Sequence, residues 1–240
     1  MKKIVVFLFV LISTVGFSQK NKKETITDNG NIQLQDRKVG TYTKINSTGS
    51  LDIILIEGQV GDVQVKASDN ILDCILTTVQ KGELTVTLDS KYNYTFRNEV
   101  VVYVPVDKNL NKISLLGAGN LTCDFKLEVS DLSCELKGAG NLKMDLKADK
   151  LTLESKGASD VDIRGHVTNL DVEILGAGSV NASNLKARKA KIVARGSSDA
   201  SFYVYDKITA KMNGAGVMTI FGNPKNRDVV VSEASEVVFK

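Results

Sequence analysis

Apolar and polar residues alternate on both sides of a short glycine phrase that recurs six times between residues 117 and 218. The copies read GAGNL, GAGNL, GASDV, GAGSV, GSSDA and GAGVM, and they begin at Gly117, Gly138, Gly157, Gly176, Gly196 and Gly214. Their first glycines are 21, 19, 19, 20 and 18 residues apart. A repeat of this length is one supersecondary unit, which buries its apolar face only by stacking on neighbouring copies.

Counting from the glycines gives the register of the repeat. Apolar residues fill the fourth and sixth positions after each glycine and, with few exceptions, the second, fourth and sixth positions before the next one. The ninth position before the next glycine is mostly apolar as well: Val129, Ala148, Val167, Ala187 and Tyr205. Because side chains of a strand alternate between its two faces, this period of two predicts strands. Each coil is therefore expected to hold a strand, a short polar corner, a second strand and a tight glycine corner.

Equivalent strands of successive coils are expected to pair in parallel, and such connections are nearly always right-handed. The predicted fold is all-β, a right-handed single-stranded parallel β-helix (β-solenoid) with 18 to 21 residues per coil. One domain should span residues 39–240, with less regular coils over 39–116 and regular coils over 117–240. In the last coil Ser235 stands where a glycine would open the next one.

The glycine phrase has a structural explanation. A tight corner between two strands needs a backbone that reaches positive φ, and stacked coils leave no room there for large side chains. The fourth residue of each phrase is polar until the last copy, and such side chains bond to turn backbone. We expect them to form a ladder along the solenoid axis: Asn120, Asn141, Asp160, Ser179 and Asp199. The phrase also lacks the third glycine and the helix of a dinucleotide-binding motif.

The first residues have the pattern of a signal peptide rather than of a fold. Lys2 and Lys3 precede a short apolar run, and small residues follow up to Ser18. We predict a signal peptide over 1–18 and a flexible leader, or an irregular first strand, over 19–38. The protein would then be exported to the periplasm or cell surface with no membrane span left after cleavage.

Composition narrows the possible functions. Of the 240 residues 42% are hydrophobic and 25% charged, and the net charge is +3 with acids and bases interspersed, so no basic patch indicates nucleic acid. The three cysteines leave at least one thiol unpaired. The register puts Cys123 and Cys134 inside on different walls, which predicts buried free thiols. No cofactor or metal is predicted.

The repeats resemble the head GIN domain family of auto-transporter adhesins, which are exported proteins of Bacteroidetes-type bacteria. The phrase G-[AS]-[GS]-[ND]-[LV] carries the resemblance, together with Val102–Pro105, the run from Ile113 to Gly117, and the strand pair at Gly61–Val65 and Gly82–Val86. It covers about residues 39–240. The resemblance implies a right-handed β-helix with a role in cell adhesion or at the cell surface, and it implies no catalytic residues.

Two sets of outward residues are candidates for a site. Glu135, Glu154 and Glu173 share one position before the next glycine, which indicates either a solvated ladder of salt bridges or a weak site for a cation or a basic partner. Asp145, Asp162 and Arg164 would lie close together across adjacent coils. His166 stands in a polar corner without an Asp or Ser partner, so it is not a convincing general base. Tyr92, Tyr94 and Phe96 alternate on one face of a strand that should be partly buried.

Two functions from different classes remain open at this stage. The first is a non-enzymatic exported solenoid that binds a surface glycan or protein in adhesion or envelope contact. The second is a carbohydrate-binding module or polysaccharide-active enzyme, which would need paired acids or Ca²⁺-binding acids in a groove. Self-association through the solenoid ends or edges is compatible with the first function.

Overall fold

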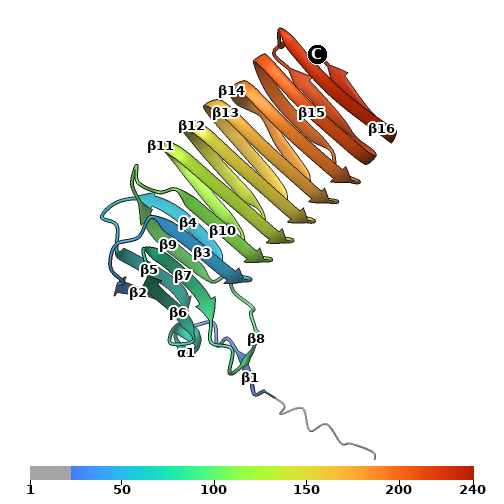
Figure 1. The fold of residues 1–240 in the computed structure, drawn as a ribbon. Coiled ribbons are helices and arrows are strands. Elements are labelled where there is room, and N and C mark those ends of the chain that lie inside the picture. The colour runs from blue at the N-terminus through green and yellow to red at the C-terminus, as the bar shows by residue number, and fades with distance from the viewer. Residues whose placement is uncertain (1–22) are drawn as a thin grey trace, which may run out of the picture.

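The structure, a computed structural model, describes residues 23–240, so the predicted signal peptide over 1–18 lies outside the described residues. It is a β-solenoid of about seven turns with one short helix, α1 (Asp69–Leu72). Successive coils stack along one axis with their strands side by side (Figure 1). The all-β parallel solenoid expected from the glycine repeat is confirmed.

Six long strands make the regular part, and each pairs in parallel with the next. They are β11 (Leu121–Gly138), β12 (Leu142–Gly157), β13 (Asp160–Gly176), β14 (Ser179–Gly196), β15 (Ala200–Phe221) and β16 (Asn226–Phe239). The register joins Gly117 to Gly138 and continues glycine to glycine as far as Gly214. The glycine phrases therefore stack at one corner of the solenoid.

The core is a set of inward columns that run the length of the molecule. Every residue at the fourth and sixth positions after a repeat glycine is buried, from Leu121 and Cys123 to Met218 and Ile220. The columns at the second, fourth and sixth positions before the next glycine are buried too, Ser155 included. Period-two counting therefore placed these five columns correctly.

The corner opposite the glycines is not simply polar, as the sequence had suggested. Leu127, Leu146 and Leu185 are buried there. The register pairs Leu127 with Leu146, Leu146 with Gly165, and Gly165 with Leu185, so the four residues form one column. In β11, β12 and β13 the alternation keeps its phase from the glycine phrase into this segment, and it changes phase only after it, where two exposed residues follow each other, as at Ser130 and Asp131. Each regular coil thus has a third inward-facing segment, which counting from the glycines alone did not give.

Tyr205 was assigned to an inward column, and that assignment is wrong. Its side chain is 46% exposed, whereas Val204 is fully buried and pairs with Ala187. The spacing from Gly196 to Gly214 is the shortest in the array, and the register between β14 and β15 shifts twice to absorb the difference. The shift turns Val204 inward and Tyr205 outward.

The N-terminal half contains ten shorter strands. They are β1 (Thr25–Thr27), β2 (Ile32–Lys38), β3 (Lys44–Gly49), β4 (Asp52–Glu57), β5 (Asp62–Ser68), β6 (Ile75–Gln80), β7 (Glu83–Leu88), β8 (Asn93–Thr95), β9 (Val101–Val106) and β10 (Lys112–Gly117). Strands β3, β4, β7, β9 and β10 continue the parallel stacking, and Gly49 pairs with Gly117. The pairs β2–β5, β5–β9 and β6–β7 are antiparallel, so this half is not made of plain coils.

The leader expected over 19–38 is ordered structure in its second half. Strand β2 pairs along its whole length with β5, and β1 pairs with β8. The Arg37 guanidinium donates to the carbonyl oxygens of Leu72 (2.7 Å) and Ile75. The polar sequence of residues 32–38 led to the expectation of a leader, but β2 is an edge strand with mostly exposed side chains, and such a strand needs few apolar residues.

The two ends of the solenoid differ. Strands β2 and β6 with α1 close the N-terminal end, whereas β16 ends the stack at the other (Figure 1). Ser235 pairs with Gly216 and its hydroxyl donates to the Gly214 carbonyl oxygen (2.9 Å). Ser235 therefore takes the third place of a glycine phrase, not the first, because Gly214 pairs with the backbone of Glu233.

Candidate functional site

The glycine column is closed to ligands. Gly117, Gly138, Gly157, Gly176, Gly196 and Gly214 all have positive φ, between 117° and 138°. A Cβ at any of them would overlap the carbonyl oxygen of the glycine one coil earlier. These carbonyls also accept backbone hydrogen bonds, as in Ala139 N–H to Gly117 O (2.8 Å). The phrase is thus a packed corner whose glycines are required by stacking alone.

The polar ladder predicted from the fourth residues of the phrases is present in the geometry. Asn141 Nδ2 donates to Asn120 Oδ1 (2.9 Å), and the Asp160 backbone N–H donates to Asn141 Oδ1 (3.3 Å). The Ser179 hydroxyl donates to Asp160 Oδ1 (2.6 Å). Asp52 begins the ladder one coil earlier, accepting from Asn120 N–H (3.0 Å). Asp199 accepts from the Val217 N–H (2.9 Å), but in the described residues no side-chain bond joins it to Ser179, so the ladder is interrupted there.

A shallow groove, the ladder groove, runs beside this column. Besides ladder residues it is lined by Glu99, Thr122, Lys143, Asp162 and Asn181. Many of its acceptors are engaged within the solenoid, since oxygens of Asp52, Asn120, Asn141, Asp160 and Asp199 accept from the next coil. Asp162 is bonded here as well, by Asn181 Nδ2 (3.3 Å). The groove therefore strengthens coil stacking first, and the polar side chains that it leaves without a hydrogen bond or ion pair in residues 23–240 include Glu99, Thr122 and Lys143.

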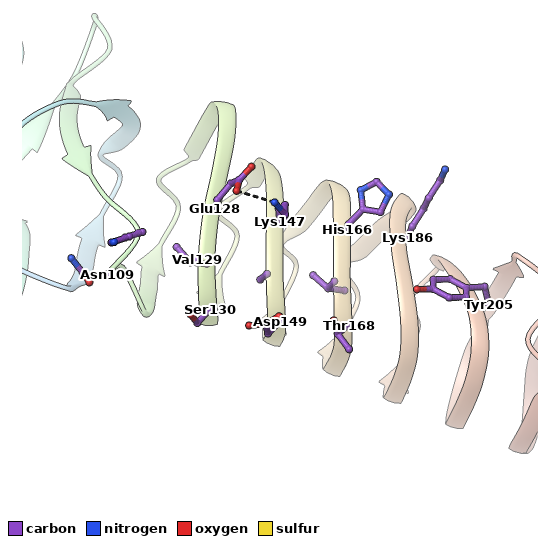
Figure 2. Close-up of a pocket in the computed structure, with 13 residues that line it drawn as sticks. Asn109, Glu128, Val129, Ser130, Lys147, Asp149, His166, Thr168, Lys186 and Tyr205 are labelled. Carbon is purple, nitrogen blue, oxygen red and sulfur yellow. Dashed lines mark hydrogen bonds and ion pairs between the residues drawn. The ribbon is translucent and has the colours of Figure 1, made fainter.

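A second groove crosses the corner opposite the glycines, and we call it the lysine–histidine groove. Figure 2 shows Glu128, Lys147, His166 and Lys186 projecting outward from successive coils, with Tyr205 beyond them. The register pairs Glu128 with Lys147, Lys147 with His166, and His166 with Lys186. The lining is completed by a row of Ser130, Asp149 and Thr168, by the apolar residues Val129, Ala148 and Val167, and by the loop residues Lys108 and Asn109.

Few contacts within the protein occupy the side chains of this groove. Glu128 Oε2 and Lys147 Nζ lie 3.0 Å apart in a solvent-exposed ion pair. Within residues 23–240, no hydrogen bond or ion pair engages the side chains of His166, Lys186 or Tyr205. Sequence reasoning missed this column, although each member stands ten residues before the next phrase glycine. Extending the count by one position would have found it.

The three carboxylates of the predicted Glu column do stack, and each has a cationic partner. Glu135, Glu154 and Glu173 pair in register across β11, β12 and β13. Glu135 pairs with Lys137 and lies 3.5 Å from Lys112, Glu154 pairs with Lys156, and Glu173 lies 3.0 Å from Arg195. The hydrogen bond from Lys137 lowers the pKa of Glu135, and Glu154 raises the pKa of Lys156.

This arrangement is a ladder of salt bridges, as the simpler interpretation had it. Its charges neutralise one another, which leaves little negative potential for a cation. Across the part of the chain that the structure describes, no group of three or more His, Cys, Asp or Glu side chains is placed to hold a metal ion. The geometry gives the cation-site alternative no support.

The second predicted cluster is divided. Arg164 Nε lies 3.0 Å from Asp145 Oδ2, so these two residues form an ion pair across β12 and β13. Asp162 belongs to the ladder groove instead, where it accepts from Asn181. Asp145 and Asp162 therefore have different partners and do not form one site.

The cysteines and the aromatic strand have structural environments. All three cysteines are free, and burial raises the pKa of both the Cys123 and Cys134 thiols to about 12. Tyr92, Tyr94 and Phe96 are half-buried and contact one another, with the rings of the last two stacked at 5.8 Å. Both features match the interpretations drawn from the sequence and add no site.

No helix within residues 23–240 is long and apolar enough to cross a membrane. The sequence model of the family described as "Putative auto-transporter adhesin, head GIN domain" matches residues 41–224. A comparison with curated proteins finds no match.

Several solved structures are similar over nearly the whole chain. A putative adhesin from Bacteroides fragilis is 25% identical with a TM-score of 0.81, covering 90% of this chain and 100% of its own. A "putative lipid binding protein" from Parabacteroides distasonis is 20% identical with a TM-score of 0.71, at the same coverage. A putative adhesin from Parabacteroides merdae is 17% identical with a TM-score of 0.67, covering 90% and 99%. The last two support the fold alone.

Proposed function

The chain belongs to the family described as "Putative auto-transporter adhesin, head GIN domain", and from that membership we propose a non-enzymatic exported protein that adheres to a surface partner. The signal peptide expected over 1–18 would direct it to the periplasm or the cell surface. The partner is a surface glycan or protein that contacts several coils at once. A solenoid suits this role because its outward columns repeat along a rigid axis.

The observation that carries the proposal is the lysine–histidine groove. It presents Lys147, His166 and Lys186 at one step per coil, spaced about 4.8 Å apart as neighbouring strands are. Tyr205 adds an exposed ring with a polar tip, a side chain that binding surfaces favour. Since no hydrogen bond or ion pair within the described chain engages the side chains of His166, Lys186 or Tyr205, their polar groups are available to an extended polar partner.

The other columns are less suited to this role. The ladder groove uses its oxygens to join coils, and the Glu column is neutralised by Lys and Arg. Neither described groove combines clustered acids with several exposed aromatic rings, which a polysaccharide-active enzyme would need. The interior is filled by the buried columns, so a lipid chain would have to bind outside.

The proposal is tested by a binding screen on the protein without residues 1–18. Labelled protein is applied to acidic and neutral glycans, to extracellular-matrix proteins and to phospholipid vesicles. We expect saturable binding to a glycan or a matrix protein, with no release of reducing ends from any glycan. Binding to vesicles alone would favour a lipid role, and release of reducing ends would establish an enzyme; either result would overturn the proposal.

A further inference from the structure

The last strand of the described chain is an edge that no further strand pairs with, although the Arg227 guanidinium lies 4.1 Å from the centroid of the Phe239 ring. Strand β16 pairs with β15 and with no other strand of the described chain. Val230 is 54% exposed and Val231 40%, and Val237 and Phe239 are only half-buried. Val231, Val237 and Phe239 pair with the buried Met212, Met218 and Ile220 of the coil before. They continue core columns that no further coil of residues 23–240 covers.

The opposite end does not offer a matching surface. There the chain closes with β2 and β6, which are antiparallel to β5 and β7, and with α1. A second molecule stacked head to tail would therefore meet antiparallel edges rather than a coil in register. This leaves the C-terminal end of another copy as the surface of the same chain that fits β16.

The sequence of β16 is complementary to itself about Ala234. This residue pairs with Ala215 at the glycine corner, so it divides β16 into one arm that runs toward the corner and one that runs away. A two-fold axis through Ala234 would lay the first arm of one copy antiparallel on the second arm of the other. Residues equally far from Ala234 along the chain would then face each other.

In that register four pairs of facing residues match in polarity or charge. Val229 faces Phe239, Val230 faces Val238, and Val231 faces Val237. Asp228 faces Lys240, and both of these side chains are exposed. A shift by one residue in either direction would bring Val229 against Lys240 or Asp228 against Phe239. The two-fold register is therefore the one that matches apolar residues and opposite charges together.

The backbone of the second arm is available for this pairing. The Lys240 N–H donates to the Ile220 carbonyl oxygen (2.9 Å), so Lys240 directs its main-chain groups toward β15. Because these groups alternate along a strand, Val237 and Phe239 direct theirs away from the solenoid. An open edge of this kind readily pairs with another strand.

We propose that β16 is a dimerisation edge, at which two copies of this chain join their solenoids tail to tail about a two-fold axis through Ala234. The dimer continues the β-stack and the apolar core across the axis. The dimer has twice the number of binding faces of a single chain. The proposal of a dimer does not depend on the proposed adhesion function.

The position of the axis is tested by cross-linking. In an antiparallel pair, facing Cα atoms lie about 4.5 to 5.5 Å apart, within the reach of a disulfide. Ala234→Cys, in a Cys74→Ser background, should therefore form a disulfide-linked dimer on mild oxidation. Ala139→Cys is the matched control, an exposed alanine at the same corner of an internal coil, and it should stay monomeric on a non-reducing gel.

The charge pairing is tested by sedimentation equilibrium. Asp228→Lys or Lys240→Asp alone places like charges at both symmetric pairs and should weaken dimerisation by about tenfold. The double variant should restore the affinity of the wild type. A wild type that stays monomeric at all concentrations, or a dimer that neither cross-links through Ala234→Cys nor responds to the charge exchange, would overturn the proposal.

Discussion

At the scale of single residues, one missing carbon atom decides what the glycine phrase can be. Gly157 has a φ of 121°, and a Cβ there would overlap the carbonyl oxygen of Gly138. The neighbouring Ala158 is exposed and donates its N–H to the same carbonyl (2.8 Å). The recurrence of glycine at this position was enough to predict a tight corner between two strands, because only glycine fits such a position in every copy.

Gly157→Ala is therefore expected to lower the free energy of unfolding by about 2 to 4 kcal/mol, from backbone strain and the overlap together. Ala158→Ser is the control, since its side chain points to solvent, and it should change stability by less than about 0.5 kcal/mol. Urea titrations of the two variants measure the difference. Equal midpoints would show that the corner tolerates a side chain and that the stacking geometry is wrong.

The Glu column shows how charge is handled along a sheet face. Three like charges in register would repel, yet Lys112 and Lys137 lie on Glu135, and the other two have cations of their own. The count from the glycines predicted the column of Glu135, Glu154 and Glu173, but it did not predict all the cationic residues that pair with it. Arg195 reaches Glu173 from the next coil, and such cross-coil contacts depend on side-chain conformations that a sequence does not specify.

The pH dependence of stability follows from Glu135. Lys137 holds the pKa of this carboxyl below its usual 4.5, so its contribution is complete above pH 4.5 and is lost as the pH falls through the native pKa. Glu135→Gln should therefore destabilise by less than about 1 kcal/mol near neutrality and by progressively less in acid. Thermal melts from pH 3 to 7 test this. A difference that stays constant across the range would contradict the ion pairing.

At the scale of elements, the third inward segment and the first strand were beyond sequence reasoning. The alternation changes phase at the polar corner after the Leu127 column, as at Ser130 and Asp131, and the number of residues between the glycine and this column differs from coil to coil, so the count from the glycines stopped short of it. Strand β2 looked like a leader because its pairing partner, β5, is far away in the sequence. Long-range pairing of a polar edge strand leaves no periodic signal.

Arg37 is the residue that fastens this first strand. It joins β2 to α1 through the Leu72 carbonyl (2.7 Å) and to β6 through Ile75 and the Thr77 hydroxyl (3.3 Å). Arg37→Met keeps the apolar stem and loses these bonds, which should cost about 2 to 3 kcal/mol. Hydrogen exchange should accelerate in β2 and β6 while β12 and β13 stay protected.

Arg188→Met is the matched control for this variant. Arg188 forms an exposed ion pair with Asp206 at 3.2 Å, so its loss should cost less than about 1 kcal/mol and leave exchange in β2 unchanged. If the two variants behaved alike, Arg37 would not be fastening the N-terminal end.

At the scale of the whole molecule, repetition made the fold predictable and the binding face difficult to predict. Six copies of one phrase give the stacking direction, the core columns and the family, because each copy repeats the same constraint. A binding face has no such repetition. Glu128, Lys147, His166 and Lys186 share a position in the count from the glycines but not a residue type, so no repeated residue marks them as a face.

The measurement that tests the central claim most directly compares two faces of the solenoid in the glycan and matrix-protein screen. One variant carries Lys147→Ser, His166→Ser and Lys186→Ser in the lysine–histidine groove. The other carries Lys191→Ser and Lys211→Ser, which removes two exposed lysines from a different face and so matches the loss of charge. Both should melt like the wild type.

If the groove is the adhesive face, the first variant loses binding to every positive probe by about tenfold or more, and the second binds like the wild type. The account is contradicted if both variants bind equally well, because adhesion would then not use this groove.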